Sequence, residues 1–217
     1  MISFVYFDIG GVLVKDFSAT NKWQEMEQEL GITREKEAKF MKFWDKHAEN
    51  IDTGQDVDNL VPLLRSEFNL SLPDNFSWLN DFVDRFEPNY SLWPIIQKIK
   101  KTTKVGLLTN LSLRMFDSIQ ASGLLPPVTW NAIVDSSIEQ VRKPDPKIYE
   151  IARERSGVPT DKILFIDNMQ KNLDTARSLG WQTFLYNPSK YDQSSQDLLA
   201  YLQDELFDSS DNNKSGQ

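Results

Sequence analysis

Apolar residues change their spacing twice along the chain. Residues 2–7, ISFVYF, form a short, mainly apolar and aromatic run without a breaker, which predicts a buried strand. From about residue 17 to residue 86 the apolar positions recur at helical spacing instead. This region predicts four helices, at about residues 21–30, 33–49, 57–68 and 74–86, with Thr33 as the N-cap of the second.

Beyond Pro88, short apolar runs alternate with helical patterns. The runs predict strands at residues 105–108, 132–134, 162–166 and 183–186. The helical patterns lie at residues 92–101, 113–122, 146–156, 171–179 and 193–207. Strands that alternate with helices in this way indicate an α/β fold with a doubly wound parallel sheet and right-handed crossovers.

The helical region is therefore interpreted as an insertion into an α/β core. We expect the core to comprise residues 1–14 and 89–208, and the all-helical insertion to comprise residues 15–88. Residues 209–217 are polar apart from one glycine and are expected to form a disordered tail.

Composition narrows the classes of partner. Of the 217 residues, 40% are hydrophobic and 12% aromatic, which suffices for a sizeable core. The net charge of −8 argues against nucleic acid or an anionic membrane as the main partner, because both require a basic face. A local basic pocket for a small anion remains compatible with this charge. No protein partner is evident.

The chain contains no cysteine and a single histidine, His47. Disulfides, thiolate metal sites and a cysteine nucleophile are therefore excluded, and a His-based triad or a multi-His metal site is disfavoured. No basic segment precedes the first apolar run, which is also too short for a signal peptide or a membrane span. We expect a soluble, cytoplasmic protein.

Polar residues fit for phosphate chemistry follow three of the predicted strands. Asp8 follows the first strand, Thr109 the second and Asp167 a later one. Each residue alone is a weak signal: Asp8 is equally compatible with a site and with the cap of a turn, and Thr109 is more typical of a cap or a turn. The carboxyl ends of parallel strands meet at one edge of a sheet, however, and this edge is where open α/β sheets bind ligands. Lys143 lies on a loop before prolines in the same part of the chain.

Four strings together resemble the motifs of the haloacid dehalogenase-like hydrolase superfamily. They are FDIGGVL at residues 7–13, LLTN at 107–110, RKPDPKIY at 142–149 and FIDNMQKNLDTARSLG at 165–180. The resemblance covers the alternating part of the chain, and the helical insertion lies where this superfamily carries a C1 cap. Within the superfamily, the chain is similar to the sugar-1-phosphatases and to the N-terminal domain of soluble epoxide hydrolase.

The resemblance implies an aspartate nucleophile and a magnesium ion. Asp8 would attack phosphorus and form an aspartyl-phosphate. Asp8, Asp167 and the backbone carbonyl of Gly10 would hold Mg²⁺, and Asn168 would help through an oriented water.

The resemblance also implies the residues that bind the phosphoryl group. Lys143 would pair with Asp8 and with the phosphate, and Thr109 would donate a hydrogen bond to a phosphoryl oxygen. Asn110 and Gly11 would contact the substrate.

One departure from the superfamily pattern concerns Gly10, which stands where a second aspartate usually protonates the leaving group and then activates water. General acid–base catalysis of this kind contributes about 10²–10⁴-fold. We therefore expect a preference for good leaving groups, such as anomeric sugar phosphates or acyl phosphates. Asp16 is the nearest candidate acid to replace the missing aspartate.

Three functions are compatible with these residues. The first is a Mg²⁺-dependent phosphatase for a small phosphorylated metabolite, such as a sugar phosphate. The second is a 2-haloacid dehalogenase, which needs no metal; Asp167 argues against it, because this carboxylate would repel a carboxylate substrate. The third is a catalytically weak protein that binds a phosphorylated ligand, which the loss of the acid at Gly10 keeps possible.

Other polar and aromatic residues have less specific interpretations. The cluster of Asp52, Asp56 and Asp58 around Gly54 is expected to be a solvated turn. Asp174 is expected to lie on a helix surface. The aromatic residues of the insertion are expected to form mainly its own core: Trp23, Phe40, Phe43, Trp44, Phe68, Phe76, Trp78, Phe82 and Phe86.

Overall fold

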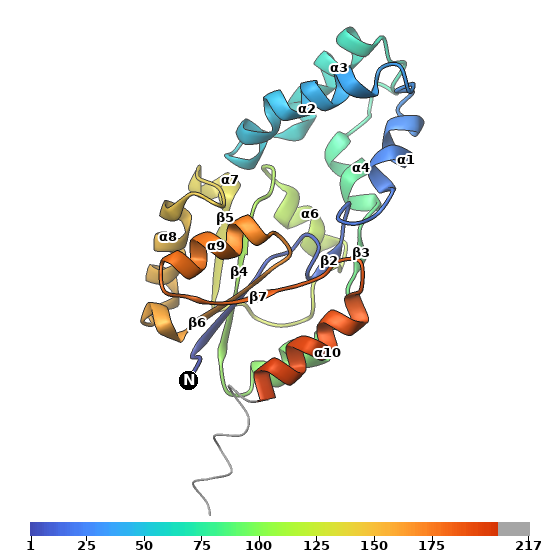
Figure 1. The fold of residues 1–217 in the computed structure, drawn as a ribbon. Coiled ribbons are helices and arrows are strands. Elements are labelled where there is room, and N and C mark those ends of the chain that lie inside the picture. The colour runs from blue at the N-terminus through green and yellow to red at the C-terminus, as the bar shows by residue number, and fades with distance from the viewer. Residues whose placement is uncertain (204–217) are drawn as a thin grey trace, which may run out of the picture.

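The computed structural model describes residues 1–203 (Figure 1). A five-stranded parallel sheet forms its core, with the strands in the order β5-β4-β1-β6-β7. These strands are β1 (Phe4–Phe7), β4 (Lys104–Thr109), β5 (Ala132–Asp135), β6 (Ile163–Asp167) and β7 (Gln182–Leu185). The predicted parallel α/β fold is therefore confirmed. The predicted tail, 209–217, and the end of the last predicted helix lie outside the described residues.

Strand β1 lies at the centre of the sheet, and its side chains are buried on both faces. Val5 and Phe7 point into one apolar cluster, whereas Phe4 and Tyr6 point into the other. Such two-sided burial explains why the strand is a continuous apolar run rather than an alternating one.

Helices cover both faces of the sheet. Helices α8 (Pro146–Ser156) and α9 (Gln170–Ser178) contribute to the cluster around Phe4 and Tyr6. Helices α5 (Trp93–Ile99), α6 (Met115–Ala121) and α10 (Tyr191–Leu202) contribute to the cluster around Val5 and Phe7. Figure 1 shows the resulting three layers, with α8 and α9 on the opposite side of the sheet from α10.

The helical insertion forms a cap above the sheet (Figure 1). It contains α1 (Lys22–Glu29), α2 (Glu37–Asp52), the 3₁₀ turn η1 (Val57–Leu60), α3 (Val61–Phe68) and α4 (Trp78–Asp84). Strands β2 (Val14–Lys15) and β3 (Glu87–Pro88) pair antiparallel where the chain leaves and re-enters the core. The sequence did not predict these two short strands, which lie at the expected domain boundaries; the boundaries themselves stay predictions.

Two predicted helix starts in the cap are wrong. Thr33 is not an N-cap, because α2 begins only at Glu37 and Thr33 closes a turn through its carbonyl, which accepts from the Lys36 N–H at 2.7 Å. Helix α4 begins at Trp78 rather than near residue 74, because Ser77 Oγ accepts from the Asn80 N–H at 3.1 Å.

No helix in the described part of the chain has the length and apolar character needed to cross a membrane.

Candidate active site

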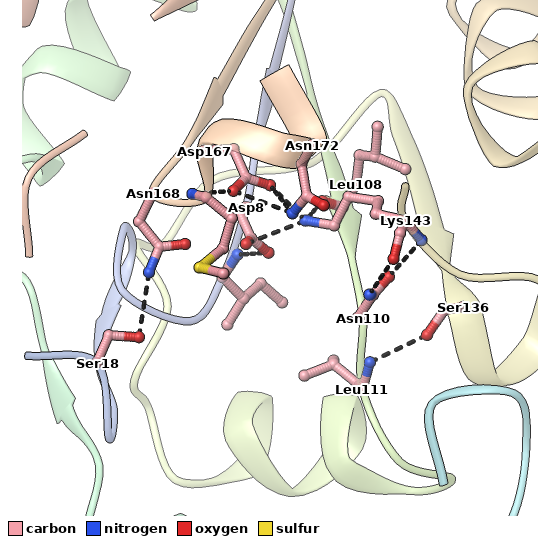
Figure 2. A network of polar contacts seen from close by, with 12 residues as sticks. Asp8, Ser18, Leu108, Asn110, Leu111, Ser136, Lys143, Asp167, Asn168 and Asn172 are labelled. Atoms are coloured by element: carbon pink, nitrogen blue, oxygen red, sulfur yellow. Dashed lines mark hydrogen bonds and ion pairs between the residues drawn. The ribbon is translucent and has the colours of Figure 1, made fainter. Parts of the chain in front are cut away.

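The three residues predicted at strand ends meet at the carboxyl edge of the sheet. Asp8 follows β1, Thr109 ends β4 and Asp167 ends β6, and β1 lies between β4 and β6. Lys143 reaches the same point from the loop between the short helix α7 (Ser136–Glu139) and α8. Figure 2 shows its ammonium pointing toward both carboxylates. The parallel topology thus brings together residues that are more than 150 positions apart in the sequence.

The Lys143 ammonium is buried and has three acceptors. Nζ lies 3.0 Å from Asp8 Oδ2 and 2.7 Å from Asp167 Oδ2, and it donates to the Leu108 carbonyl at 3.0 Å. Burial alone would lower the pKa of Lys143, but the charges of Asp167 and Asp8 outweigh burial and hold the pKa above its usual value. Lys143 is therefore a fixed positive charge between two carboxylates.

Asp8 is largely buried, but a small part of it is exposed in the cavity. Its residue is 8% exposed, and Oδ1 accepts from the Ile9 N–H at 2.7 Å. Burial raises the pKa of Asp8 to about 7, against the opposing charge of Lys143, and Asp167 raises it further. A divalent cation bound here would act in the same direction as Lys143 and favour the ionised carboxylate.

Asp167 is held by a residue that the predicted site did not include. Asn172 Nδ2 donates to Oδ1 and Oδ2 of Asp167 at 3.2 and 3.0 Å, and the Met169 N–H donates to Oδ1 at 2.7 Å. The Tyr149 hydroxyl in turn donates to the Asn172 backbone carbonyl at 2.8 Å. Asn172 is buried, whereas Asp174 is exposed as expected. The signal in the sequence was that Asn172 lies in the first turn of the helix after Asp167.

Asn110 binds the backbone of Lys143 through both ends of its amide. Oδ1 accepts from the Lys143 N–H at 2.9 Å, and Nδ2 donates to the Lys143 carbonyl at 3.0 Å. Asn110 therefore fixes the loop that carries the lysine, and its predicted contact with substrate stays a prediction. The neighbouring Thr109 Oγ1 is buried and has no hydrogen-bond partner within residues 1–203. A phosphoryl oxygen would satisfy this hydroxyl.

Position 11 requires glycine because the Asn168 side chain approaches the backbone closely there. A Cβ at position 11 would lie 2.1 Å from Asn168 Nδ2, and the backbone of Gly11 has a φ of +72°. Asn168 Nδ2 donates to Ser18 Oγ at 3.1 Å. These contacts give Gly11 a packing role beside its predicted contact with substrate.

The space beside Gly10 is filled by another carboxylate. A Cβ at position 10 would lie 2.5 Å from Asp16 Oδ2, and Asp16 Oδ1 accepts from the Ser18 N–H at 2.8 Å. Burial raises the pKa of Asp16, against the hydrogen bonds from Ser18. Asp16 lines the same cavity as Asp8 and Lys143, whose volume is about 260 Å³. A carboxyl group therefore lies beside position 10, on a residue six positions later in the chain.

The acidic turn of the cap is not a solvated turn, contrary to expectation. Asp52 pairs with Arg142 at 2.9 Å, next to Lys143 in the sequence. Arg114 binds both Asp56 and Asp58. Both arginines belong to the core, so these carboxylates hold the tip of the cap against the loops that form the site. A composition rich in acids could not reveal partners in another part of the fold.

The donors around Asp8 suit a hard cation. Asp8 and Asp167 converge on one ammonium, and Gly10 and Asn168 line the same cavity as Asp8. Within residues 1–203 no three His, Cys, Asp or Glu side chains form a metal-binding group. Mg²⁺ nevertheless needs only one or two carboxylates, because it retains several waters and prefers oxygen ligands. The residues present therefore fit Mg²⁺ rather than zinc or another soft metal.

Comparisons with known proteins agree with this geometry. A family model described as haloacid dehalogenase-like hydrolase matches residues 2–180. A Danio rerio protein, haloacid dehalogenase-like hydrolase domain-containing protein 3, is 36% identical over 85 residues, which cover 39% of this chain and 34% of that protein. A protein of Mycobacterium tuberculosis (strain CDC 1551 / Oshkosh) named as a phosphatase is 33% identical over 94 residues, which cover 42% of this chain and 42% of that protein.

Among solved structures, a HAD family enzyme from Bacteroides thetaiotaomicron has a similar fold. Its structure in complex with magnesium and inorganic phosphate has a TM-score of 0.68 at 18% identity, and the match covers 87% of this chain and 96% of that one. By contrast, the chain spans well under half the length of the curated relatives it matches, from 8% to 42%.

Removal of the Lys143 ammonium is expected to lower the stability of the protein strongly. In Lys143→Met, Asp8 and Asp167 lose their shared cation, and two buried carboxylates repel each other. We expect the free energy of unfolding in metal-free buffer to fall by about 3–5 kcal/mol, as when one partner of a buried ion pair is removed. Urea denaturation measures it, with the exposed Lys101→Met as the control. Equal stability of the two variants would contradict this description of the site.

Proposed function

The chain belongs to the haloacid dehalogenase-like hydrolases, and we propose that it is a Mg²⁺-dependent phosphomonoester hydrolase that uses Asp8 as its nucleophile. The observation that carries the proposal is the convergence of Asp8, Asp167 and Lys143 at one sheet edge. Two carboxylates and one fixed ammonium provide a nucleophile, oxygen ligands for a cation and a binding group for a phosphoryl oxygen.

Two relatives support the phosphatase proposal. The Bacteroides thetaiotaomicron enzyme has been solved with magnesium and inorganic phosphate, and the Mycobacterium tuberculosis relative is named as a phosphatase. In this chain, Asp8, Asp167, the Gly10 carbonyl and Asn168 would hold the Mg²⁺. When bound, the ion would neutralise phosphoryl charge and favour ionised Asp8.

The reaction proceeds in two displacements. A carboxylate oxygen of Asp8 bonds to phosphorus while the bond from phosphorus to the ester oxygen breaks, and the released alkoxide takes up a proton. Water then attacks the aspartyl-phosphate, which releases inorganic phosphate and regenerates Asp8. Lys143 and the unpaired Thr109 hydroxyl hold phosphoryl oxygens during both displacements.

Asp16 takes the place of the missing acid in this proposal. Its carboxyl occupies the space that a side chain at position 10 would need, and it faces the same cavity as Asp8. From this position it can donate a proton to the leaving oxygen and accept one from the attacking water.

The dehalogenase alternative agrees less well with the site. Asp167 is fully buried, and Asn172 and the Met169 N–H hold it in place. A carboxylate held in this way is suited to bind a cation, whereas it would repel the carboxylate of a 2-haloacid.

The first prediction of the proposed function concerns the nucleophile. Acetyl phosphate hydrolysis should require Mg²⁺, and Asp8→Asn should lower kcat by at least about 10³-fold, because an amide does not form the acyl phosphate. A phosphate-release assay measures this, with the exposed Asp45→Asn as the matched control. Release that persists in Asp8→Asn would rule out the mechanism.

A second prediction concerns Asp16. Asp16→Asn should lower kcat/KM for an alkyl ester such as glycerol 3-phosphate by about 10²-fold, and much less for acetyl phosphate, whose leaving group needs no proton. Combining Gly10→Asp with Asp16→Ala, which vacates the space, should restore part of the loss. An equal loss on both substrates would contradict the assignment.

A third prediction concerns Asn172. Asn172→Ala removes two hydrogen bonds to Asp167 and should weaken Mg²⁺ binding by about 10–100-fold, a typical effect of residues that orient metal ligands. Asp174→Ala on the exposed side of the same helix is the control. Calorimetric titration with Mg²⁺ measures both variants; equal affinities would show that Asn172 does not orient the ligand.

A further inference from the structure

A second cavity adjoins the phosphate site beneath the cap. Its volume is about 200 Å³, and it shares the walls of Phe86, Asn110, Leu111 and Met115 with the cavity that contains Asp8. A phosphomonoester whose phosphoryl group contacts Asp8 would therefore extend its other end toward this space.

The walls of the second cavity are mainly aromatic. Phe17, Trp23, Trp44, Phe82 and Phe86 line it. The sequence assigned most of these rings to the core of the cap, but they also form the surface that faces the site. Such walls favour an apolar occupant, because apolar area is removed from water on both sides.

The polar side chains of this cavity are mostly occupied. Asp52 pairs with Arg142, both ends of the Asn110 amide bind the backbone of Lys143, and the Trp23 indole donates to Glu27 at 3.0 Å. Each of these groups already uses part of its hydrogen-bonding capacity on an existing partner, which leaves fewer sites for the hydroxyls of a sugar.

Ser112 is the exception. Its hydroxyl is buried in the cavity wall and has no hydrogen-bond partner within residues 1–203. A buried hydroxyl left without a partner is unfavourable. A single polar atom on an otherwise apolar ligand would satisfy it.

We infer that the second cavity binds the non-phosphate part of the substrate, and that this part is an apolar group of about the size of one ring with at most a few polar atoms. The inference rests on the proposed function, because that function places the phosphoryl group at Asp8. A cavity of about 150 Å³ with apolar walls can bind benzene, so the volume here suits one ring. A sugar, with several hydroxyls to pair, does not match these walls.

Binding of two phosphonates tests the inference without turnover. Methylphosphonate reaches only the phosphate site, whereas benzylphosphonate would also place its ring in the second cavity. In calorimetric titrations with Mg²⁺ present, benzylphosphonate should bind about ten- to a hundredfold more tightly, given the apolar area of one ring. Equal affinities would overturn the inference.

A variant that narrows the second cavity tests whether the ring of benzylphosphonate binds there. Ser112→Leu adds an apolar side chain at the cavity wall and should abolish the advantage of benzylphosphonate over methylphosphonate. Ser66→Leu, on the exposed side of the cap, should preserve this advantage. If Ser112→Leu does not fold, the wild-type comparison of the two phosphonates still decides the question. An advantage that survives in folded Ser112→Leu would place the ring elsewhere.

Hydrolysis separates this inference from the proposed function. Benzyl phosphate and glucose 6-phosphate are both esters of primary alcohols, so their P–O cleavage is comparable, and the inference predicts a higher kcat/KM for benzyl phosphate. A higher value for glucose 6-phosphate would overturn it. If benzylphosphonate binds preferentially but neither these esters nor acetyl phosphate are hydrolysed, the apolar subsite stands and the proposed hydrolysis fails.

Discussion

The buried ammonium of Lys143 determines how the site is built. It lies within 3.0 Å of one oxygen of Asp8 and one of Asp167, which stand at the carboxyl ends of the neighbouring strands β1 and β6. Two carboxylates this close to each other are unfavourable in a buried site unless a positive charge lies between them. Other contacts serve this arrangement: Asn110 fixes the backbone of the lysine, and Asn172 fixes the second carboxylate.

The cap contributes to the same site at two places. Asp16, just after the paired strands at the base of the cap, supplies a carboxyl beside Gly10. At the tip of the cap, Asp52 binds Arg142, the neighbour of Lys143. Aromatic rings between these contacts enclose the second cavity. Residues of the cap therefore line both cavities and belong to the set of groups that face the site.

Local signals made much of the fold predictable from the sequence. Helix α8 has the predicted bounds, because Asp145 and Pro146 start it and Gly157, with a φ of +68°, ends it. The central strands β1, β4 and β6 are recognisable because they are almost entirely buried and therefore mainly apolar. Asp8, Thr109 and Asp167 come together because parallel strands end at one edge of the sheet. Lys143 joins them from the loop between α7 and α8.

The remaining features depend on contacts between distant parts of the chain. The position of the Asp16 carboxyl beside Gly10 follows from the missing side chain at Gly10 and from the path of the chain between them. Asp52 looked like part of a solvated turn because its partner, Arg142, lies 90 residues away. The polarity of the second cavity depends on which of its polar groups already have partners, and no local pattern encodes this.

The central claim is that Asp8 becomes phosphorylated during turnover. Acid quenching of the protein during hydrolysis of acetyl phosphate, followed by peptide mass spectrometry, tests this claim most directly. The account predicts one added phosphoryl group on the peptide that contains Asp8, present with Mg²⁺ and absent when Mg²⁺ is chelated. Phosphate release with no phosphoryl group on Asp8 at any time during turnover, or with the phosphoryl group on another residue, would contradict it.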